Sequence, residues 1–428
     1  MPAKRVPVLI ITYYWPPSGG AGVQRWLKFS KYLPEFGWDP IILTVDQAYA
    51  AYPVTDNSLT DDLPSTVKVY TTPATNYFNI YKKDKSRIPS AGFANNVDNT
   101  FKGKFFRFVR GNFFIPDPRR GWNKYAFKKA CELIETAGIR HVITTSPPHS
   151  TQLIGLKIKK RYPAIKWIAD LRDPWTDIYY YKQFYPTIVS KAIDLKYEKS
   201  VLKKSDKIIT VGASLKTLFS TKIPGLERKT EVITNGYDES DFKDVKVTSP
   251  SRFTITYVGT LSDIYPIEGL IPALKTLQAE DKDFILRFVG TVSEKTKKML
   301  VNEIQDNHLD FLPYVAHSDA ITFMQRSSIL LLIIPLHQSN NSIITGKIFE
   351  YIASSVPILC LGPATGDAAQ IIRSVSGGET FNYFDSDAIY DFVVHPINKQ
   401  PQSGKDEKII YSRKELTRQL SEILKMKK

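Results

Sequence analysis

Two charged side chains near the start of a short predicted helix could bind a nucleotide that carries phosphate and sugar groups. Lys347 and Glu350 lie in a stretch that predicts a polar turn, a helix over 347–354 and a buried strand after Pro357. Residues three apart share a helix face, and the first turn of a helix has free N–H groups that favour anions. The ammonium suits a phosphate, and the carboxylate can accept hydrogen bonds from ribose or sugar hydroxyls. The alternative is that both are ordinary solvated charges.

The segment around these two residues resembles the signature of retaining GT-B glycosyltransferases, in particular their large family 4. That signature has a glutamate, seven further residues, and then a second glutamate followed by small and apolar residues and a proline. The second half is matched by Glu350-Tyr351-Ile352-Ala353 and by Pro357. The resemblance implies that Glu350 binds the ribose of a nucleotide donor, with Thr345 and Gly346 beside it.

The sequence departs from the signature at two places. Ser342 stands where the first glutamate is expected, so contact with the donor sugar would come from neutral groups of Asn341 and Ser342. After the first strand of the second half, the family has Gly-Arg-Leu and then a lysine, which neutralise the leaving diphosphate. Here Gly259 is followed by Thr260 and no such lysine. We expect Lys347 to take over this role, with Gly259 and Thr260 at the donor site.

A glycine-rich loop in the first half is a further candidate ligand site. Gly19 and Gly20 follow a predicted strand over 6–12 and precede a predicted helix over 23–36. Glycine lets a phosphate or sugar approach the backbone closely, and ligands bind at the carboxyl ends of strands in open α/β sheets. The spacing does not match the dinucleotide fingerprint. The alternative is a plain tight turn.

Three polar residues follow later strands of the first half, and we assign them catalytic roles. His149 comes after a predicted strand over 141–145, and the family often has a histidine there, near the donor sugar. Arg172 and Asp173 follow the next strand, where Asp173 could orient the acceptor and Arg172 could face phosphate. The alternatives are a residue at a helix start for His149 and a structural ion pair for the other two.

The alternation of strands and helices predicts an α/β protein with two domains. Helices separate the strands in both halves, which is typical of parallel sheets. With the resemblance, this implies a GT-B fold, with two Rossmann-like domains facing a central cleft. We expect an acceptor-side domain over 1–243, a nucleotide-sugar donor domain over 253–400, and a C-terminal helix over 406–428 that crosses back to the first domain.

The positive charge of the chain is concentrated in one segment. The formal net charge is +15, of which 13 Lys or Arg against three Asp in residues 81–130 supply +10. A basic aromatic insertion over about 75–120 contains Phe101, Phe105 and Phe108 at helical spacing. Such a face suits an anionic membrane surface; the alternative is an insertion whose phenylalanines pack on the domain. No nucleic-acid motif is found, so nucleic acid is not an expected partner.

Together with these observations, the resemblance implies a metal-independent hexosyltransferase, which we expect to act in surface polysaccharide biosynthesis. It would move a sugar from a nucleoside diphosphate sugar to a glycan or lipid-linked acceptor, with retention of the configuration at the anomeric carbon. It would need no cofactor beyond that co-substrate. No apolar run reaches the roughly 18 residues of a membrane span, so we expect a cytoplasmic protein, with peripheral contact at the inner membrane face as an option. Cys131 and Cys360 have apolar surroundings and are expected to be reduced core residues.

Two other functions remain open on the sequence. A nucleotide-sugar 2-epimerase would share the fold and would need no acceptor. A non-catalytic nucleotide-sugar-binding scaffold would explain the absence of the first glutamate and of the Arg-Lys pair. An oxidoreductase is disfavoured because the phosphate fingerprint is unmatched.

Overall fold

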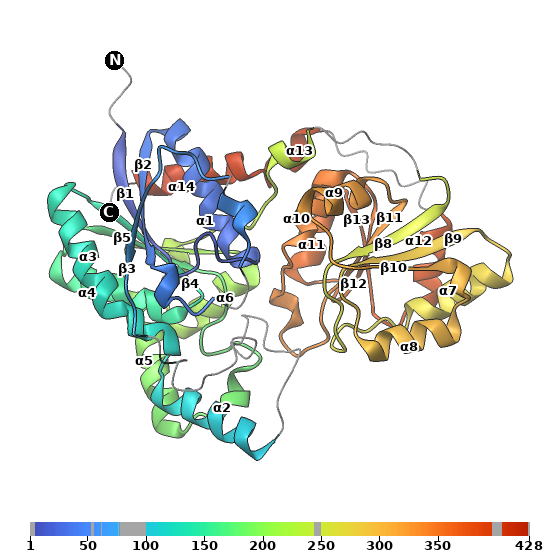
Figure 1. Ribbon diagram of the computed structural model, residues 1–428, viewed down its shortest axis with the longest axis horizontal. Helices are drawn as coiled ribbons and strands as arrows, with labels where there is room; N and C mark the ends of the chain where they lie inside the picture. Colours follow the sequence, from blue (N-terminus) through green and yellow to red (C-terminus); the bar gives the residue numbers. More distant parts are fainter. Residues whose placement is uncertain are drawn as a thin grey trace. The chain divides into compact units, whose positions relative to one another are not determined.

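The computed structural model describes residues 5–52, 55–60, 62–75, 77, 100–243, 250–395 and 405–426. The chain forms two compact units (Figure 1). Unit 1 comprises Met1–Thr234 together with Arg413–Lys428, and unit 2 comprises Asn235–Ser412. Within the basic aromatic insertion, residues 75, 77 and 100–120 are described; its residues 76 and 78–99, and residues 244–249 of the expected linker, lie outside the described ranges.

Unit 1 is built on a parallel sheet of seven strands in the order β3-β2-β1-β4-β5-β6-β7. The strands are β1 (Val6–Ile11), β2 (Trp38–Val45), β3 (Lys68–Thr72), β4 (His141–Ser146), β5 (Lys166–Leu171), β6 (Lys207–Thr210) and β7 (Thr230–Val232). The helices are α1 (Ala21–Tyr32), α2 (Phe101–Phe113), α3 (Asn123–Thr136), α4 (Gln152–Arg161), α5 (Ile188–Lys204), α6 (Ala213–Lys222) and α14 (Arg413–Lys425).

Unit 2 repeats this architecture with six parallel strands in the order β10-β9-β8-β11-β12-β13. The strands are β8 (Phe253–Val258), β9 (Phe284–Val289), β10 (Leu309–Leu312), β11 (Ile329–Ile333), β12 (Ile358–Leu361) and β13 (Gly378–Phe381). The helices are α7 (Leu270–Ala279), α8 (Glu294–Glu303), α9 (His317–Gln325), α10 (Lys347–Ser354), α11 (Asp367–Ser374), α12 (Ser386–Val394) and α13 (Lys405–Ile409).

The expected pair of parallel-sheet, Rossmann-like units is confirmed by these two sheets. Two elements were missed in the sequence. Strand β3 lies at the sheet edge, and its pattern of exposed and half-buried residues is too weak to read as a strand. Helix α6 has only two fully buried side chains, so its apolar periodicity is faint.

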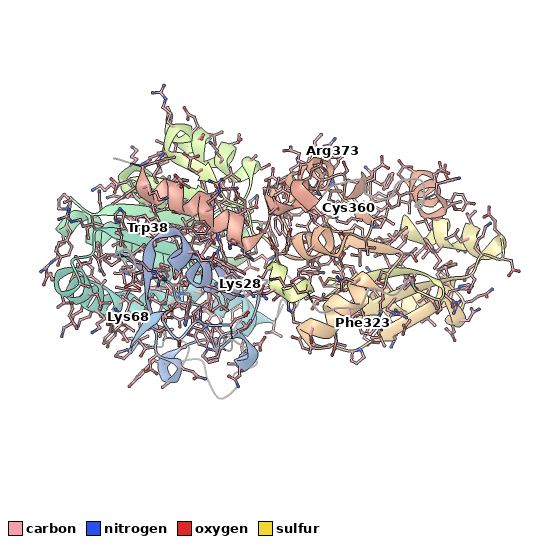
Figure 2. All side chains as sticks on the ribbon, turned by 90° about the horizontal axis from the view of Figure 1, so that it is seen from above. Lys28, Trp38, Lys68, Phe323, Cys360 and Arg373 are labelled. Carbon is pink, nitrogen blue, oxygen red and sulfur yellow. The ribbon has the colours of Figure 1, made fainter. Side chains whose placement is uncertain are left out.

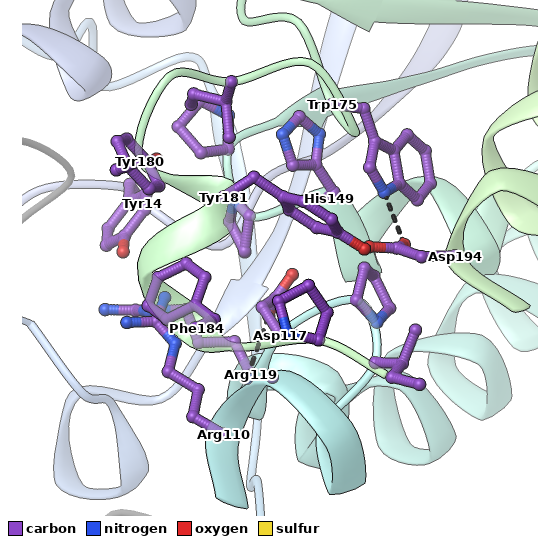
Figure 3. A pocket seen from close by; sticks show the side chains of 17 residues that line it. Tyr14, Arg110, Asp117, Arg119, His149, Trp175, Tyr180, Tyr181, Phe184 and Asp194 are labelled. Carbon is purple, nitrogen blue, oxygen red and sulfur yellow. Dashed lines mark hydrogen bonds between the residues drawn. The ribbon is translucent and has the colours of Figure 1, made fainter. Parts of the chain in front are cut away.

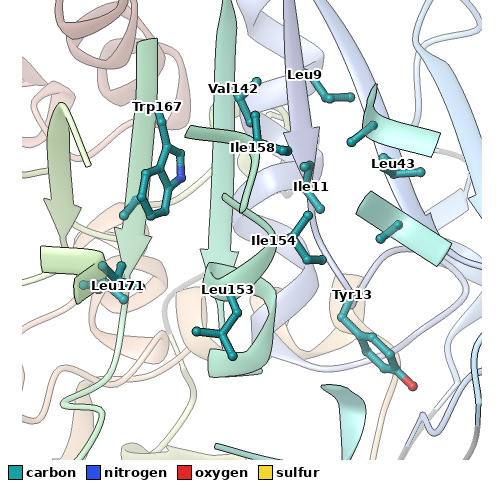
Figure 4. Packing of buried hydrophobic residues seen from close by; sticks show 14 of the residues in the cluster. Leu9, Ile11, Tyr13, Leu43, Val142, Leu153, Ile154, Ile158, Trp167 and Leu171 are labelled. Carbon is teal, nitrogen blue, oxygen red and sulfur yellow. The ribbon is translucent and has the colours of Figure 1, made fainter. Parts of the chain in front are cut away.

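The central strands of both sheets are buried on both faces, which explains their continuous apolar runs. In β1, Leu9 and Ile11 face one layer of the core, and Val8 and Ile10 face the other, all with no exposed surface. Figure 4 shows Leu9 and Ile11 on the side of α4, which contributes Ile154 and Ile158 to the same cluster. Helices α1 and α14 cover the opposite face.

Helix α14 is fixed to unit 1 although it follows unit 2 in the sequence. Trp38, labelled in Figure 2, donates from Nε1 to Oγ of Ser421 at 3.1 Å. The ammonium of Lys166 donates to the carbonyls of Ile423 and Leu424 at 2.6 and 3.0 Å. These carbonyls belong to the last turn of α14, whose C=O groups have no partner within a helix, so a cation there satisfies them.

The two cysteines are free and buried, in agreement with the expectation from the sequence. Cys131 lies on α3 in unit 1, and Cys360 lies on β12 in unit 2 (Figure 2). Neither belongs to a disulfide.

Candidate functional site

The strand order of each sheet identifies where ligands should bind. In unit 1, strands β1 to β3 follow one another towards one edge of the sheet, and β4 to β7 follow one another towards the other edge, so the order reverses between β1 and β4. In unit 2 the same reversal lies between β8 and β11. In doubly wound sheets, ligands bind beyond the carboxyl ends of the strands at such a reversal. The loops after β1 and β4 carry Gly19, Gly20 and His149, and those after β8 and β11 carry the residues assigned to the donor.

In unit 2, the glycine after β8 makes room for a lysine. Gly259 has φ of 115°, in the region that favours glycine. A Cβ at this position would lie 2.9 Å from Cε and 3.0 Å from Nζ of Lys347. The backbone conformation therefore favours glycine at this position, and a Cβ there would also displace the end of the Lys347 side chain.

Lys347 is the first residue of α10, and its ammonium lies against Tyr257 at the end of β8. Nζ donates to the hydroxyl of Tyr257 at 2.7 Å and lies 3.9 Å from the centre of the ring. The same hydroxyl donates to the carbonyl of Thr260 at 2.9 Å. Burial lowers the pKa of Lys347 to about 7, while Glu350 acts in the opposite direction. An anion bound beside this ammonium would stabilise its charged form.

Glu350 lies one turn further along α10 and contacts the first residue of α9. Nε2 of His317 is 3.0 Å from Oε1 of Glu350. The carboxylate is partly accessible, with 23% of its side-chain surface exposed, so it can still accept hydrogen bonds from a ligand. His317 thus fixes the orientation of the carboxylate from a neighbouring helix.

The turn before α10 contains the remaining donor-site candidates. Ser342 belongs to the single-turn helix η13 (Asn340–Ser342), and its hydroxyl donates to the carbonyl of Ser339 at 3.0 Å. Asn341 and Gly346 are exposed. The hydroxyl of Thr345 is buried and has no hydrogen-bond partner among the described residues. A buried polar atom without a partner is unusual, and a ligand could bond this hydroxyl only if the surrounding side chains moved to expose it.

In unit 1, the glycine loop after β1 ends where α1 begins. Gly20 has φ of 93° and precedes the first residue of α1. A Cβ there would meet nothing within 4 Å, so the need for glycine is conformational. Gly19 is half-buried beside it.

Arg172 connects three segments at this edge of the sheet. Its Nε donates to the carbonyl of Ser146 at the end of β4, and its Nη1 donates to the carbonyl of Gly22 in α1, both at 2.8 Å. The guanidinium therefore positions the loops, and a contact with phosphate stays a prediction. Burial raises the pKa of the adjacent Asp173, while Arg172 opposes this shift.

His149 stacks on Trp175, with ring centres 4.8 Å apart and planes inclined by 13°. Burial lowers its pKa to about 3, and Lys222 and Arg172 act in the same direction. The imidazole is neutral at pH 7, so it can exchange hydrogen bonds with a ligand but brings no positive charge. Its Nδ1 is buried without a partner among the described residues.

His149 also lines a pocket within unit 1 that the sequence did not reveal (Figure 3). One wall comes from α2 and the residues after it, and another comes from η9 (Tyr181–Phe184) and α5. The guanidinium of Arg110 lies 4.2 Å from the ring centre of Phe184. The pocket is therefore lined by aromatic rings together with prolines and isoleucines, and four charged side chains lie among them.

Two carboxylates in this pocket differ in their surroundings. Asp117 accepts hydrogen bonds from the backbone N–H and the hydroxyl of Ser150, both at 2.8 Å. Asp194 accepts from Nε1 of Trp175 at 2.7 Å and from the hydroxyl of Tyr181 at 3.0 Å. Burial raises the pKa of Asp194 to about 6, which these two hydrogen bonds partly offset. Asp194 therefore keeps its proton to a higher pH than an exposed aspartate does.

Comparison with known proteins adds evidence on the fold. No family model matches the chain, and no curated protein matches its sequence. Among solved structures, it is similar to sucrose-phosphate synthase from Thermosynechococcus elongatus, with a TM-score of 0.62 and 12% identity over 98% of both chains. It is also similar to HepE from Anabaena in complex with UDP, with a TM-score of 0.61 and 12% identity over 98% of this chain and 99% of the other. The chain has the GT-B fold.

A third similar structure belongs to another class of enzyme. It is a putative UDP-N-acetylglucosamine 2-epimerase from Listeria monocytogenes, with a TM-score of 0.57 and 9% identity over 98% of this chain and 96% of the other. At these identities the comparisons establish the fold, and the reaction must be argued from the site.

The structure brings the predicted residues into two groups, one in each unit. Gly259, Thr260, Lys347 and Glu350 gather at the strand reversal of unit 2. His149 and Arg172 lie at the strand reversal of unit 1. The sequence missed Tyr257 and His317, which contact Lys347 and Glu350. Tyr257 reads as a core residue of a strand, and His317 is 33 residues from its partner, so neither has a local signal.

Proposed function

We propose that the chain is a retaining glycosyltransferase that uses a nucleoside diphosphate sugar and acts in surface polysaccharide biosynthesis. The observation that supports this most directly is the arrangement of Lys347 and Glu350 on α10. The ammonium lies beside Gly259 at the carboxyl end of β8, and the carboxylate is oriented by His317 one turn away. A phosphate and a ribose of one nucleotide need a cation and a carboxylate placed in this way.

In this proposal each donor-site residue has a defined task. Glu350 accepts hydrogen bonds from the ribose hydroxyls, and Lys347 binds the diphosphate together with the backbone N–H groups at the start of α10. The hydroxyl of Thr345 and the polar groups of Asn341 and Ser342 contact the sugar. UDP is the nucleotide to test first, because the similar HepE structures contain UDP or UDP-glucose.

The reaction breaks the bond between the anomeric carbon and the diphosphate oxygen, and the oxygen leaves with the electron pair. An acceptor hydroxyl forms the new glycosidic bond on the same face of the sugar, and its proton passes to the departing phosphate. The transition state has oxocarbenium character, as in glycoside hydrolysis. Negative charge grows on the diphosphate, so a preorganised ammonium such as that of Lys347 stabilises it.

We assign the acceptor to the pocket of unit 1. Apolar and aromatic walls with a few polar groups are typical of sites for small organic ligands, and the pocket, with a volume of about 80 Å³, would hold one small group of a glycan or lipid-linked acceptor. His149 would hydrogen-bond the acceptor or the sugar in its neutral form, and Asp173 would orient the acceptor. The proposal includes a cytoplasmic location with peripheral contact at the inner face of the membrane.

Two other reactions fit the same fold. A 2-epimerase is supported by the similar Listeria protein, and it would turn over donor without an acceptor. A nucleotide-sugar-binding scaffold is supported by Ser342 and Thr260 at the places of the family's glutamate and arginine, and it would bind donor without turnover. The position of Lys347 favours the two enzymes over the scaffold, because it supplies a cation for a departing diphosphate, and the resemblance of the segment around Glu350 favours the transferase.

Donor binding is tested by thermal shift with UDP and UDP-sugars on wild type, Glu350→Gln and Glu303→Gln. Glu303 is a matched control in unit 2, because it forms only an exposed pair with Lys275. A ligand at 100 times its dissociation constant adds about 2.7 kcal/mol. We expect a shift in wild type and in Glu303→Gln and its loss in Glu350→Gln. No shift with any nucleotide diphosphate in folded wild-type protein would contradict the donor site.

Turnover separates the three functions. UDP release that requires an acceptor identifies a transferase, and proton NMR of the product shows whether the configuration is retained. Conversion of donor without an acceptor identifies an epimerase, and binding without turnover identifies a scaffold.

A further inference from the structure

Exposed hydrophobic side chains are concentrated on one part of unit 1. Of the 20 large hydrophobic side chains that are exposed in the described ranges, ten lie on α2, on α5 or at Tyr185 just before α5. Within this group of ten, the most exposed side chains are Ile188 at 87%, Phe101 at 86%, Phe113 at 70% and Val189 at 68%. The others in this group are Phe105, Phe106, Phe108, Tyr185, Ile193 and Leu195. We call this group the α2–α5 surface.

The two helices are held together by direct contacts. Asn112, near the end of α2, donates to the carbonyl of Tyr185 at 3.0 Å and accepts from the N–H of Thr187 at 2.7 Å. The hydroxyl of Ser190 in α5 donates to the same amide oxygen at 2.7 Å. These bonds join the C-terminal end of α2 to the start of α5, so Phe113 and Ile188, which follow Asn112 and Thr187, are near neighbours of this junction. Figure 1 shows both helices at the same end of unit 1.

A glycine sets the packing of α2 on this part of the unit. A Cβ at Gly111 would lie 2.3 Å from the carbonyl oxygen of Phe184. On the same side of α2, Arg110 and Arg107 lie over the rings of Phe184 and Tyr185. The side of α2 that faces the protein is therefore occupied by Gly111 and the two arginines, and the phenylalanines are left on the outside.

The accessible charges on these helices have a single sign. Together, α2 and α5 contain nine Lys or Arg and two acidic residues. Both acids, Asp194 and Glu198, are buried and bonded inside unit 1. The lysines at 102, 104, 191 and 196 are exposed. Aromatic and aliphatic side chains surrounded by cations are the features of a surface that lies in the interface of an anionic bilayer.

We infer that the α2–α5 surface binds the face of a membrane that contains anionic lipid. The phenylalanines and Ile188 would enter the interface, and the lysines would contact lipid phosphates. None of the described helices is long and apolar enough to span a bilayer, so this would be a peripheral contact. A second copy of the chain is a poorer partner, because it would bring the same positive charges together. Single-stranded nucleic acid could stack its bases on the phenylalanine rings, but it would leave the exposed aliphatic side chains of Ile188 and Val189 without an apolar partner, so a bilayer fits the surface better.

The test is co-sedimentation with vesicles of phosphatidylcholine, with and without phosphatidylglycerol, at low and high salt. One variant combines Phe101→Ser, Phe105→Ser and Phe108→Ser, and a second combines Ile188→Ser and Val189→Ser. The control combines Tyr314→Ser and Phe384→Ser, which are 83% and 59% exposed in unit 2. All these side chains are on the surface, so the variants should fold.

We expect wild type and the control to bind anionic vesicles in a salt-sensitive manner, and each variant to bind roughly tenfold more weakly or worse. Wild-type protein that stays in the supernatant, or variants that bind as well as wild type, would overturn the inference. A dimer in solution that the phenylalanine variant dissolves would assign the surface to a second copy and overturn it as well. Vesicle binding needs no nucleotide, so its outcome is independent of the proposed reaction.

Discussion

The ammonium of Lys347 donates to the hydroxyl of Tyr257 at 2.7 Å and lies 3.9 Å from the centre of its ring. This contact places a lysine from the start of α10 at the end of β8, where the related glycosyltransferase signature would supply an arginine and a lysine. Burial lowers the pKa of this lysine to about 7. Its charge at neutral pH therefore depends on whether an anion is bound.

Binding of a nucleoside diphosphate should be coupled to uptake of a proton by Lys347. Above pH 7 the free Lys347 is largely neutral, and a bound diphosphate would return it to the charged form. At pH 8, titration calorimetry with UDP in two buffers of different ionisation enthalpy should give different heats for wild type. The difference should vanish in Lys347→Met, which should also bind UDP at least roughly tenfold more weakly, as expected for the loss of a hydrogen bond to a charged group. Equal heats in both buffers for wild type would contradict the assignment.

Lys347 should make the stability of unit 2 depend on pH. Its folded pKa of about 7 lies below the ordinary value of 10.5, so between these values the unfolded chain holds a proton that the folded chain has released. Stability therefore rises with pH across this window. Lys347→Met should therefore melt at a higher temperature than wild type. This difference in melting temperature should be largest below pH 7 and should shrink as the pH approaches 10. A difference that does not change with pH would show that Lys347 is not desolvated.

Glu350→Gln should weaken nucleotide binding without affecting pyrophosphate. The carboxylate is assigned to the ribose, and losing a hydrogen bond to a charged group costs about 1.5–3 kcal/mol. Competition assays should show a roughly tenfold or greater loss for UDP and no change for pyrophosphate. His317→Asn should give a smaller loss in the same direction, because Glu350 would keep its charge but lose its 3.0 Å contact. Equal losses for UDP and pyrophosphate would place Glu350 at the phosphates instead.

The imidazole of His149 should stay neutral across the physiological range. Burial lowers its pKa to about 3, so its NMR signals should not shift between pH 8 and pH 5. Because the unfolded chain binds the proton near pH 6.5, wild-type stability should fall faster than that of His149→Gln as the pH drops below 6.5. A titration of His149 with an apparent pKa of 6 or above would contradict its burial against Trp175.

Asp170→Asn should destabilise unit 1 strongly. Asp170 and Arg25 are fully buried and 3.1 Å apart, and the same carboxylate accepts from Nε1 of Trp26 and the hydroxyl of Thr145, each at 2.8 Å. Breaking a buried pair leaves an uncompensated charge and costs about 3–5 kcal/mol. We expect the melting temperature to drop by several degrees or more. Glu132→Gln, in an exposed pair with Lys129, is the control and should melt as wild type does.

The strands and helices that could be predicted are those that a local pattern of residues determines. Runs of apolar residues marked most strands, and the predicted helix over 347–354 matches α10 (Lys347–Ser354). The pocket of unit 1 could not be predicted in this way. It combines Arg110 with Asp194, which are 84 residues apart and have no shared pattern in the sequence. The contacts of Arg172 could not be predicted either, because only the folded chain brings its guanidinium to the carbonyls of Ser146 and Gly22.

The attachment of α14 to unit 1 also bears on how the chain is made. The core beside α1 contains Leu416, Leu420 and Leu424, and Lys166 is matched by carbonyls at the end of α14. Domains generally fold in order as they leave the ribosome. Here the first sheet to be synthesised lacks part of its cover until residues 413–425, which follow unit 2 in the sequence, have been added. Unit 2 has all its strands before then, so the second half of the protein can reach its final structure while the first half still waits for its closing helix.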